Sequence, residues 1–341
     1  MRRDLVSVYR CPGTRGILTL RDEVLAGDTV VSGQLVSSAG HVYDIEDGIP
    51  NLAWPLQLTE ADTAIREFYD GRADVYDRYL PLTFATFSEN EDKVRREMID
   101  LLSLAPGQRV LEVGAGTGRD SEIIAGLLGP TGELFAQDIS RSMLLHNRER
   151  LTGIHQRAHL GVANACYLPF PDKFFDAVFQ FGGVGEFSDI PGFFREVARV
   201  TKVGGRVVVG DESMPTWLRQ TTFAKILTLT NAQFAAPLPL EHLPVEARQV
   251  RVRWVIGGTF YLIDFNVGEG EPEADLDFQI PGIRGGTHRT RYFGQLEGVR
   301  LETKQLALLA RDKLGISLHE WLDGLVRREA EAVLKDKEGN G

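Results

Sequence analysis

Short apolar runs and helical patterns alternate through the middle of the chain. Four runs predict buried β-strands: residues 110–113, 132–138, 175–181 and 204–210. Helical patterns follow the first and the third of these runs, at 119–128 and 191–200. Two later apolar runs, 250–256 and 259–265, flank a two-glycine turn, and this pattern predicts an antiparallel pair of strands.

The flanking segments predict smaller elements. Residues 1–55 indicate short β segments separated by turns. A helix is expected to begin at 59–62 with Thr59 as its cap, and Gly71 interrupts the apolar positions that continue to Tyr79. That break would suit a movable cover. Further helices are predicted at 89–104, 217–234, 303–313 and 318–334.

Composition and charge narrow the class of protein. The 341 residues carry a formal net charge of −10, which argues against a general nucleic-acid partner because such surfaces are basic. Cys11 and Cys166 lie far apart and predict no disulfide framework, which fits a reducing cytosol, so we expect a cytoplasmic protein. We also expect no membrane span, which needs roughly 20 apolar residues, and no secretory signal.

Three glycines at alternate positions end the first predicted strand, at 114, 116 and 118. Such a turn lets the backbone approach a ligand closely, although any tight strand-to-helix turn uses glycine. The second strand ends on Asp138, 20 residues after Gly118, an offset at which α/β nucleotide sites place a carboxylate for the ribose hydroxyls. Alternatively, Asp138 is only an acidic residue at a helix N-terminus, before Ser140.

The spacing Glu112-x-Gly114-x-Gly116-x-Gly118 resembles motif I of the class I S-adenosylmethionine (SAM)-dependent methyltransferases. Residues 137–143 are similar to the second motif of that family, and residues 161–178 to its segment between strands three and four. The resemblance covers about residues 60–268. It implies an α/β fold with a Rossmann-like, seven-stranded class I methyltransferase sheet, with SAM as cofactor and S-adenosylhomocysteine (SAH) as product.

The same resemblance implies a set of cofactor contacts. Asn164 stands where the family usually has Asp, and its amide oxygen could accept the adenine amino group without charge. Cys166 would flank the adenine, or belong to the core. The implied cofactor-binding residues are Glu112, Gly114, Ala115, Gly116, Gly118, Asp138, Ile139, Met143, Asn164, Ala165, Cys166, Phe181, Tyr69 and Tyr76.

Two other segments carry resemblances of their own. Cys11-Pro12 and residues 47–52 resemble the small zinc ribbon that precedes some methyltransferases. That fold needs four metal ligands, and His41 is the one other candidate here, so we expect a metal-free β module, either roofing the substrate or only stabilising the fold. Residues 66–77 look like the entry helix of quinone- and sterol-type methyltransferases, with Tyr69 and Tyr76 either covering the SAM site or lying in the core. The expected domains are 1–55, 56–268 and a C-terminal extension, 269–341.

The chemistry of methyl transfer points to the loops after strands four and five. The donor is already activated, so no metal is required, and ligands of open α/β sheets lie beyond the carboxyl ends of the strands. If a base is needed, the candidates are Glu186, Asp211, Glu212 and His288, each of which could also be a helix cap or a solvated group. The basic residues that could grip an anionic acceptor, or merely form a solvated turn, are Arg284, His288, Arg289 and Arg291.

We therefore predict a SAM-dependent methyltransferase that acts on a small-molecule acceptor, either a natural product or a metabolite. The alternative is a non-catalytic SAM-binding regulatory or assembly protein, which the lack of an obvious base supports. A third interpretation, an NAD-linked oxidoreductase, is disfavoured because Arg119 stands where the glycine pattern would continue. The apolar positions of the two C-terminal helices predict packing or a homodimer.

Overall fold

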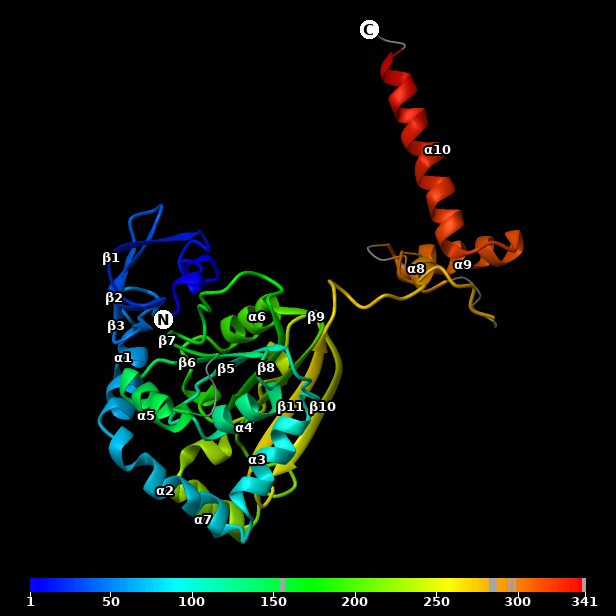
Figure 1. The fold of residues 1–341 in the computed structure, drawn as a ribbon. Coiled ribbons are helices and arrows are strands. Elements are labelled where there is room, and N and C mark those ends of the chain that lie inside the picture. Colours follow the sequence, from blue (N-terminus) through cyan, green and yellow to red (C-terminus); the bar gives the residue numbers. More distant parts are fainter. Residues whose placement is uncertain (154–156, 282–286, 294–295, 297–298, 339–341) are drawn as a thin grey trace. The chain divides into compact units, whose positions relative to one another are not determined.

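The chain divides into two compact units, Met1–Pro272 and Glu273–Gly341. The computed structural model describes residues 1–153, 157–281, 287–293, 296 and 299–338. Within that described part, both β-sheets belong to the first unit and the second unit is helical (Figure 1).

An antiparallel four-stranded sheet forms the N-terminal module. A short 3-10 helix, Arg3–Ser7, precedes its strands, which pair in sequence order. These strands are β1 (Leu18–Ala26), β2 (Thr29–Ser37), β3 (Val42–Glu46) and β4 (Ile49–Pro50). The Leu52 N–H donates to the Val162 carbonyl at 2.8 Å, so the module is joined to the edge of the second sheet.

The Cys11 thiol of this module lies among polar side chains. Its Sγ is 3.5 Å from His41 Nδ1 and 3.3 Å from the Tyr43 hydroxyl oxygen. Burial raises the pKa of Cys11, but hydrogen bonds from Thr14, Tyr43 and His41 outweigh burial and lower it to about 6. In the described residues, no group of three or more His, Cys, Asp or Glu side chains is placed to hold a metal ion. The likeness to a zinc ribbon stays a prediction.

The central sheet has seven strands in the order β10-β11-β9-β8-β5-β6-β7. Strands β5 to β9 run parallel, whereas β11 is antiparallel to both β9 and β10. This topology confirms the predicted class I methyltransferase sheet, including the antiparallel pair that closes it. The strands are β5 (Arg109–Val113), β6 (Glu133–Asp138), β7 (Ala158–Val162), β8 (Phe175–Phe181), β9 (Thr201–Glu212), β10 (Ala247–Val255) and β11 (Phe260–Val267).

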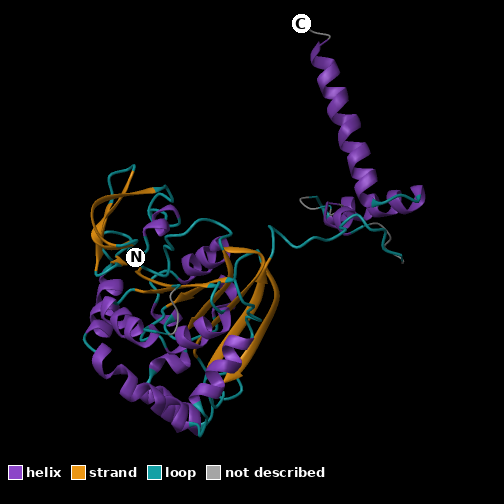
Figure 2. Ribbon diagram, in the orientation of Figure 1, coloured by secondary structure: helices purple, strands orange, loops and turns teal. Residues whose placement is uncertain are grey.

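Helices pack against the central sheet (Figure 2), and the residues of its parallel strands are mainly buried and apolar, whereas the edge strand β10 carries three arginines and is partly exposed. Side chains alternate across the sheet: Leu111 and Val113 pack in one core cluster, and Val110 in the other. The α-helices of this unit are α1 (Glu60–Asp70), α2 (Ala73–Thr86), α3 (Glu91–Asp100), α4 (Arg119–Leu128), α5 (Arg141–Leu151), α6 (Ile190–Val200) and α7 (Thr222–Thr230).

The predicted long helix from 217 to 234 is wrong, because α7 covers only nine residues, Thr222–Thr230. The Thr221 hydroxyl accepts the Ala224 N–H and so caps the helix late. At the other end, the side chain of Asn231 caps a separate 3-10 helix, η3 (Ala232–Ala235). Two other 3-10 turns follow β8 and η3, namely η2 (Val184–Glu186) and η4 (Pro239–His242).

The second unit contains α8 (His288–Phe293), α9 (Leu301–Leu314) and α10 (Leu318–Glu338). Gly315, with φ of 68°, ends α9, as the sequence predicts. The predicted capping box of α10 is confirmed: Ser317 N–H donates to Glu320 Oε2 at 2.9 Å, and Glu320 N–H donates to Ser317 Oγ at 3.1 Å. Nowhere in the described ranges is a helix long and apolar enough to cross a membrane.

Candidate active site

A cavity of about 480 Å³ lies at the carboxyl ends of the parallel strands. Loops after β5, β6, β7, β8 and β9 form its floor and walls, and α1, α2 and η3 complete it. Its lining residues are Asp62, Ile65, Phe68, Tyr69, Arg72, Tyr76, Val113, Gly114, Gly116, Asp138, Ile139, Met143, Ala163, Asn164, Ala165, Phe181, Gly182, Gly183, Glu186, Phe187, Asp211, Glu212, Asn231 and Gln233. Most of the predicted site residues therefore meet in one place.

The three glycines after β5 differ in how much space surrounds them. All three have positive φ angles, namely 67° at Gly114, 51° at Gly116 and 87° at Gly118. A Cβ added at Gly116 would meet no protein atom within 4 Å, so that position is open towards the cavity. A Cβ at Gly118 would lie 2.7 Å from the Asn147 side chain, so Gly118 is required for packing against α5.

Asp138 lies at the end of β6 with both carboxylate oxygens held by backbone amides. Gly116 N–H donates to Oδ2 at 2.9 Å, and Ser140 N–H donates to Oδ1 at 2.8 Å. Burial raises the pKa of this carboxyl to about 6, although those two hydrogen bonds act to lower it. Since each oxygen keeps acceptor capacity, the carboxylate can still receive a vicinal diol from the cavity.

Asn164 lines the cavity, and both ends of its side-chain amide have protein partners. Its Nδ2 donates to Asp62 Oδ2 at 3.2 Å, and its Oδ1 accepts the Cys166 N–H at 3.0 Å. The Cys166 thiol points elsewhere and donates to the Asp189 carbonyl at 3.3 Å. Cys166 does not line this cavity because its side chain faces the groove beside α6.

Three other predicted cofactor residues lie behind the cavity wall: Glu112, Ala115 and Gly118. Glu112 points from β5 towards α4, where its carboxyl accepts a hydrogen bond from the Ser121 hydroxyl. Burial raises the pKa of Glu112 well above its usual range. Glu112 therefore faces α4, on the side of the sheet opposite Leu111 and Val113, because alternate residues of a strand face opposite sides of the sheet.

The predicted cover residues Tyr69 and Tyr76 both line the cavity. The Tyr69 hydroxyl donates to Glu186 Oε2 at 2.7 Å and thereby spans the cavity from α1 to η2. The centroids of the two tyrosine rings are 6.1 Å apart. Burial raises the pKa of Glu186, while the hydrogen bond from Tyr69 acts to lower it.

The two acids at the end of β9 have different environments. Asp211 accepts the Gly183 N–H at 2.9 Å on Oδ1 and the Gly185 N–H at 2.7 Å on Oδ2, so its carboxylate holds the loop after β8. Burial and hydrogen bonding with Asp211 raise the pKa of Glu212 well above its usual range. The raised pKa favours the neutral form of Glu212, and the carboxylate of Asp211 is occupied by two amides, so Glu186 is the better placed of the predicted bases in this unit.

The remaining predicted residues belong to the second unit. His288 begins α8, and Arg289 forms an ion pair with Asp277, with Nε 3.0 Å from Oδ1. Arg291 lies in the last turn of α8. Arg284 lies outside the described residues. All of the residues that line the cavity come from the first unit.

Sequence reasoning missed several lining residues on α1 and α2. Asp62, Ile65 and Arg72, together with the predicted Tyr69 and Tyr76, recur every three or four positions along α1 and across the turn at Gly71 into α2. This spacing, visible in the sequence, could have predicted the part of the cavity wall that α1 and α2 form. Asn231 and Gln233 had no such signal, because they reach the cavity only through the turn that ends α7.

Residues 110–205 match the family described as a methyltransferase domain. The chain contains a class I SAM-dependent methyltransferase domain. The chain is 38% identical over 123 residues to a ubiquinone/menaquinone biosynthesis C-methyltransferase from Ectopseudomonas mendocina. The aligned region covers 36% of this chain and 48% of that protein. A demethylmenaquinone methyltransferase from Symbiobacterium thermophilum is 32% identical over 163 residues, covering 47% of this chain and 64% of that protein. The chain thus spans about half the length of the first relative.

Solved structures similar to the methyltransferase domain include two enzymes. Phosphoethanolamine N-methyltransferase 2 from Haemonchus contortus, in complex with SAM, has 14% sequence identity, a TM-score of 0.49, and coverage of 72% of this chain and 71% of that chain. Geranyl diphosphate C-methyltransferase from Streptomyces coelicolor has 14% identity and a TM-score of 0.46, with coverage of 62% of this chain and 100% of that chain.

Proposed function

We propose that this protein transfers the methyl group of SAM to a small-molecule acceptor inside the cavity at the carboxyl ends of β5 to β9. The observation that carries the proposal is the pairing of an open glycine, Gly116, with the carboxylate of Asp138 on the rim of one cavity. The cofactor supplies a methyl group activated on a sulfonium, so the protein has to bind, align and exclude water.

The chain's own residues fit that cofactor. Asp138 would accept the ribose hydroxyls, while Gly114 and Gly116 leave room for the rest of the molecule against the backbone. The apolar side chains of Ile139 and Met143 would flank the adenine. Asn164 would face its amino group through the remaining lone pair of Oδ1.

Charges in the cavity bear on the acceptor. Arg72 is the one cationic side chain among the described residues that line the cavity, whereas Asp62, Asp138, Glu186 and Asp211 are acids, and the raised pKa of the fifth acid, Glu212, favours its neutral form. This balance favours a neutral or cationic acceptor, and an anionic acceptor would have to pair with Arg72. The relative from Ectopseudomonas mendocina is named a C-methyltransferase, which supports carbon as the methylated atom.

The decisive experiment measures binding first and turnover second. Calorimetric titration with SAM and with SAH should give one site per chain, and incubation with methyl-labelled SAM and a metabolite extract should transfer label to a small molecule. Failure of both SAM and SAH to bind would overturn the proposal. Nicotinamide cofactor binding stronger than SAM binding would instead support an oxidoreductase.

A non-catalytic SAM-binding protein remains the second candidate. The observation that favours it is that two acids of the cavity wall are already engaged, since Asp211 holds two amides and Glu186 accepts the Tyr69 hydroxyl. It predicts binding of SAM with no labelled product. Deletion of residues 301–338 would then abolish partner association.

The organisation of the whole chain belongs to the same proposal. We infer three functional segments, 1–55, 56–268 and 269–341, and a homodimer formed through the C-terminal helices. Exposed apolar side chains on α9 and α10 support the dimer, among them Leu306, Leu309 and Val333. Sedimentation of the full chain and of a chain lacking residues 301–338 tests it: a dimer should become a monomer. The two cysteines, both free and buried, fit a reducing cytosol.

A further inference from the structure

Four polar contacts fasten α1 and α2 to four different loops of the cavity. Each loop follows one of the parallel strands β5 to β8, and α1 makes three of the contacts while α2 makes one. The contacts are Thr117 Oγ1 to Asp77 Oδ1 (2.6 Å), Ser140 Oγ to Asp70 Oδ1 (2.6 Å), Asn164 Nδ2 to Asp62 Oδ2 (3.2 Å) and Tyr69 hydroxyl to Glu186 Oε2 (2.7 Å).

Apolar packing contributes little to this attachment. The buried residue of α1 is an acid, Asp62, and the buried residues of α2 are Ala73 and Phe84. Phe84 lies in the last turns of α2, where it joins the core cluster under α3. Tyr79 and Leu82 are more than half exposed. A segment held mainly by polar contacts at its surface opens at a lower free-energy cost than the sheet beneath it.

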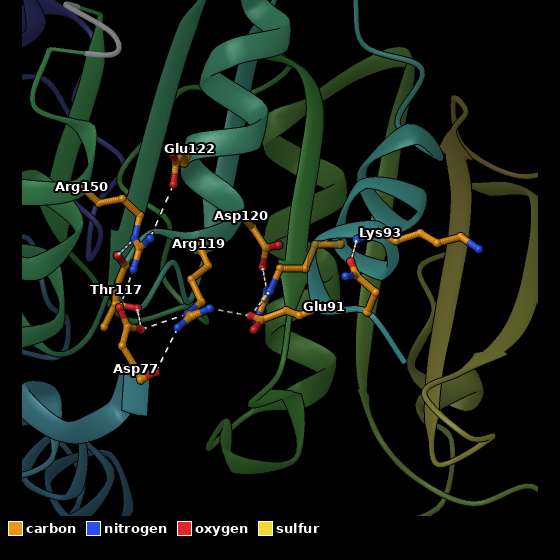
Figure 3. A network of polar contacts seen from close by, with 10 residues as sticks. Asp77, Glu91, Lys93, Thr117, Arg119, Asp120, Glu122 and Arg150 are labelled. Carbon is orange, nitrogen blue, oxygen red and sulfur yellow. Dashed lines mark hydrogen bonds and ion pairs between the residues drawn. The ribbon is translucent and has the colours of Figure 1, made fainter. Parts of the chain in front are cut away.

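Asp77 is the contact point with the most partners (Figure 3). Besides the Thr117 hydroxyl, its carboxylate accepts from Arg119 Nε at 3.0 Å and forms a short contact with Arg150. The Asp77 backbone carbonyl also accepts from Arg119 at 3.0 Å. One residue of α2 thereby binds the glycine loop, the start of α4 and the end of α5.

The partners of Asp77 are themselves fixed. Arg119 also donates to Glu91 Oε1 at 2.9 Å, and Arg95 donates to the same Glu91 oxygen at 2.8 Å. Arg95 Nη1 also donates to Asp120 Oδ2 at 2.6 Å, and the Arg95 side chain is only 6% exposed. The network in Figure 3 therefore has a buried, rigid side on α3 and α4. Asp77 is its attachment to α2.

We propose that Asp77 is a positioning residue that holds α2 closed over the cofactor cavity, and that its release admits and releases the cofactor. Neighbouring residues of a helix point about 100° apart. With Asp77 turned to the glycine loop, Tyr76 is turned into the cavity, where it lines the wall. The inference rests on the proposed function, because the occupant of the cavity is taken to be SAM or SAH.

The test compares the full-length protein with Asp77→Asn, which keeps the size of the side chain but removes its charge. We expect the SAH dissociation rate in stopped flow to rise about tenfold, as loss of charge-assisted hydrogen bonds at a partly exposed site predicts. Amide hydrogen exchange should become faster in residues 60–83 and stay unchanged in β5 and β6. A purely structural role would instead lower the melting temperature and speed exchange throughout the domain.

Two further variants make the result decisive. Glu122→Gln is the matched control, because Glu122 pairs with the same Arg150, at 3.5 Å, but does not touch α2; it should leave both rates unchanged. Thr117→Val removes one hydrogen bond to Asp77 and should shift both rates in the same direction by less. Unchanged rates in Asp77→Asn, or equal effects in the control, overturn the inference. If the wild-type protein binds neither SAM nor SAH, the proposed function falls, while the exchange measurement still tests the contact.

Discussion

Replacement of Asp138 by alanine tests the placement of the cofactor. Its carboxylate offers about four lone-pair sites, of which the N–H groups of Gly116 and Ser140 occupy two. Two sites remain for the ribose hydroxyls. Hydrogen bonds to a charged group contribute about 1.5–3 kcal/mol in total at such a site. That loss corresponds to a roughly 10- to 150-fold increase in the dissociation constant for SAH.

The assay is calorimetric titration of wild-type, Asp138→Ala and Asp138→Asn proteins with SAH, accompanied by thermal melts. The alanine variant should fold, because water in the cavity can reach the two amides that lose their acceptor. The asparagine variant should also bind weakly, since its NH₂ group would face one of two N–H donors. Wild-type affinity in Asp138→Ala would refute the reasoning and place the ribose elsewhere.

The raised pKa of Asp138 adds a pH test. Its folded-state value of about 6 exceeds its ordinary value of 3.8, so its contribution favours the folded free protein below about pH 4 and is lost as pH rises through about 6. Binding has the opposite sign, because the ribose hydroxyls need the charged acceptor. SAH should therefore bind more weakly at pH 5 than at pH 7.5. Affinity that does not change over this range would contradict the assignment, and Asp138→Asn should lose the dependence.

Three other substitutions follow from the structure. Gly116→Ala should lower stability by about 1–2 kcal/mol because of its φ of 51°, yet block SAH binding, as calorimetry would show, since the new Cβ enters open cavity space. Tyr69→Phe removes the hydrogen bond that lowers the pKa of Glu186, so the acid limb of the pH–activity profile should move to higher pH. Arg95→Met leaves Asp120 buried without its cation and should lower the free energy of unfolding by about 3–5 kcal/mol in denaturant titration.

The parallel strands and the glycine loop could be predicted because local signals specify them. Val110, Leu111 and Val113 form a short apolar run that only Glu112 interrupts, and positive φ angles follow at the alternating glycines. The end of α7 and the role of Glu112 could not be predicted in this way. A capping hydroxyl at Thr221 competes with an apolar pattern that would continue the helix, and the direction of Glu112 depends on which side of β5 faces α4.

By itself, the sequence determined where most of the central strands lie along the chain, the glycine turn after β5 and the acid at the end of β6, since each is encoded within a few neighbouring residues. Only the tertiary structure decided which polar groups are already bonded. Asp211 binds two amides from the loop after β8, and Asp77 meets Thr117 from 40 residues away. Such pairings depend on how helices pack over strand ends, and no local period in the chain records that packing.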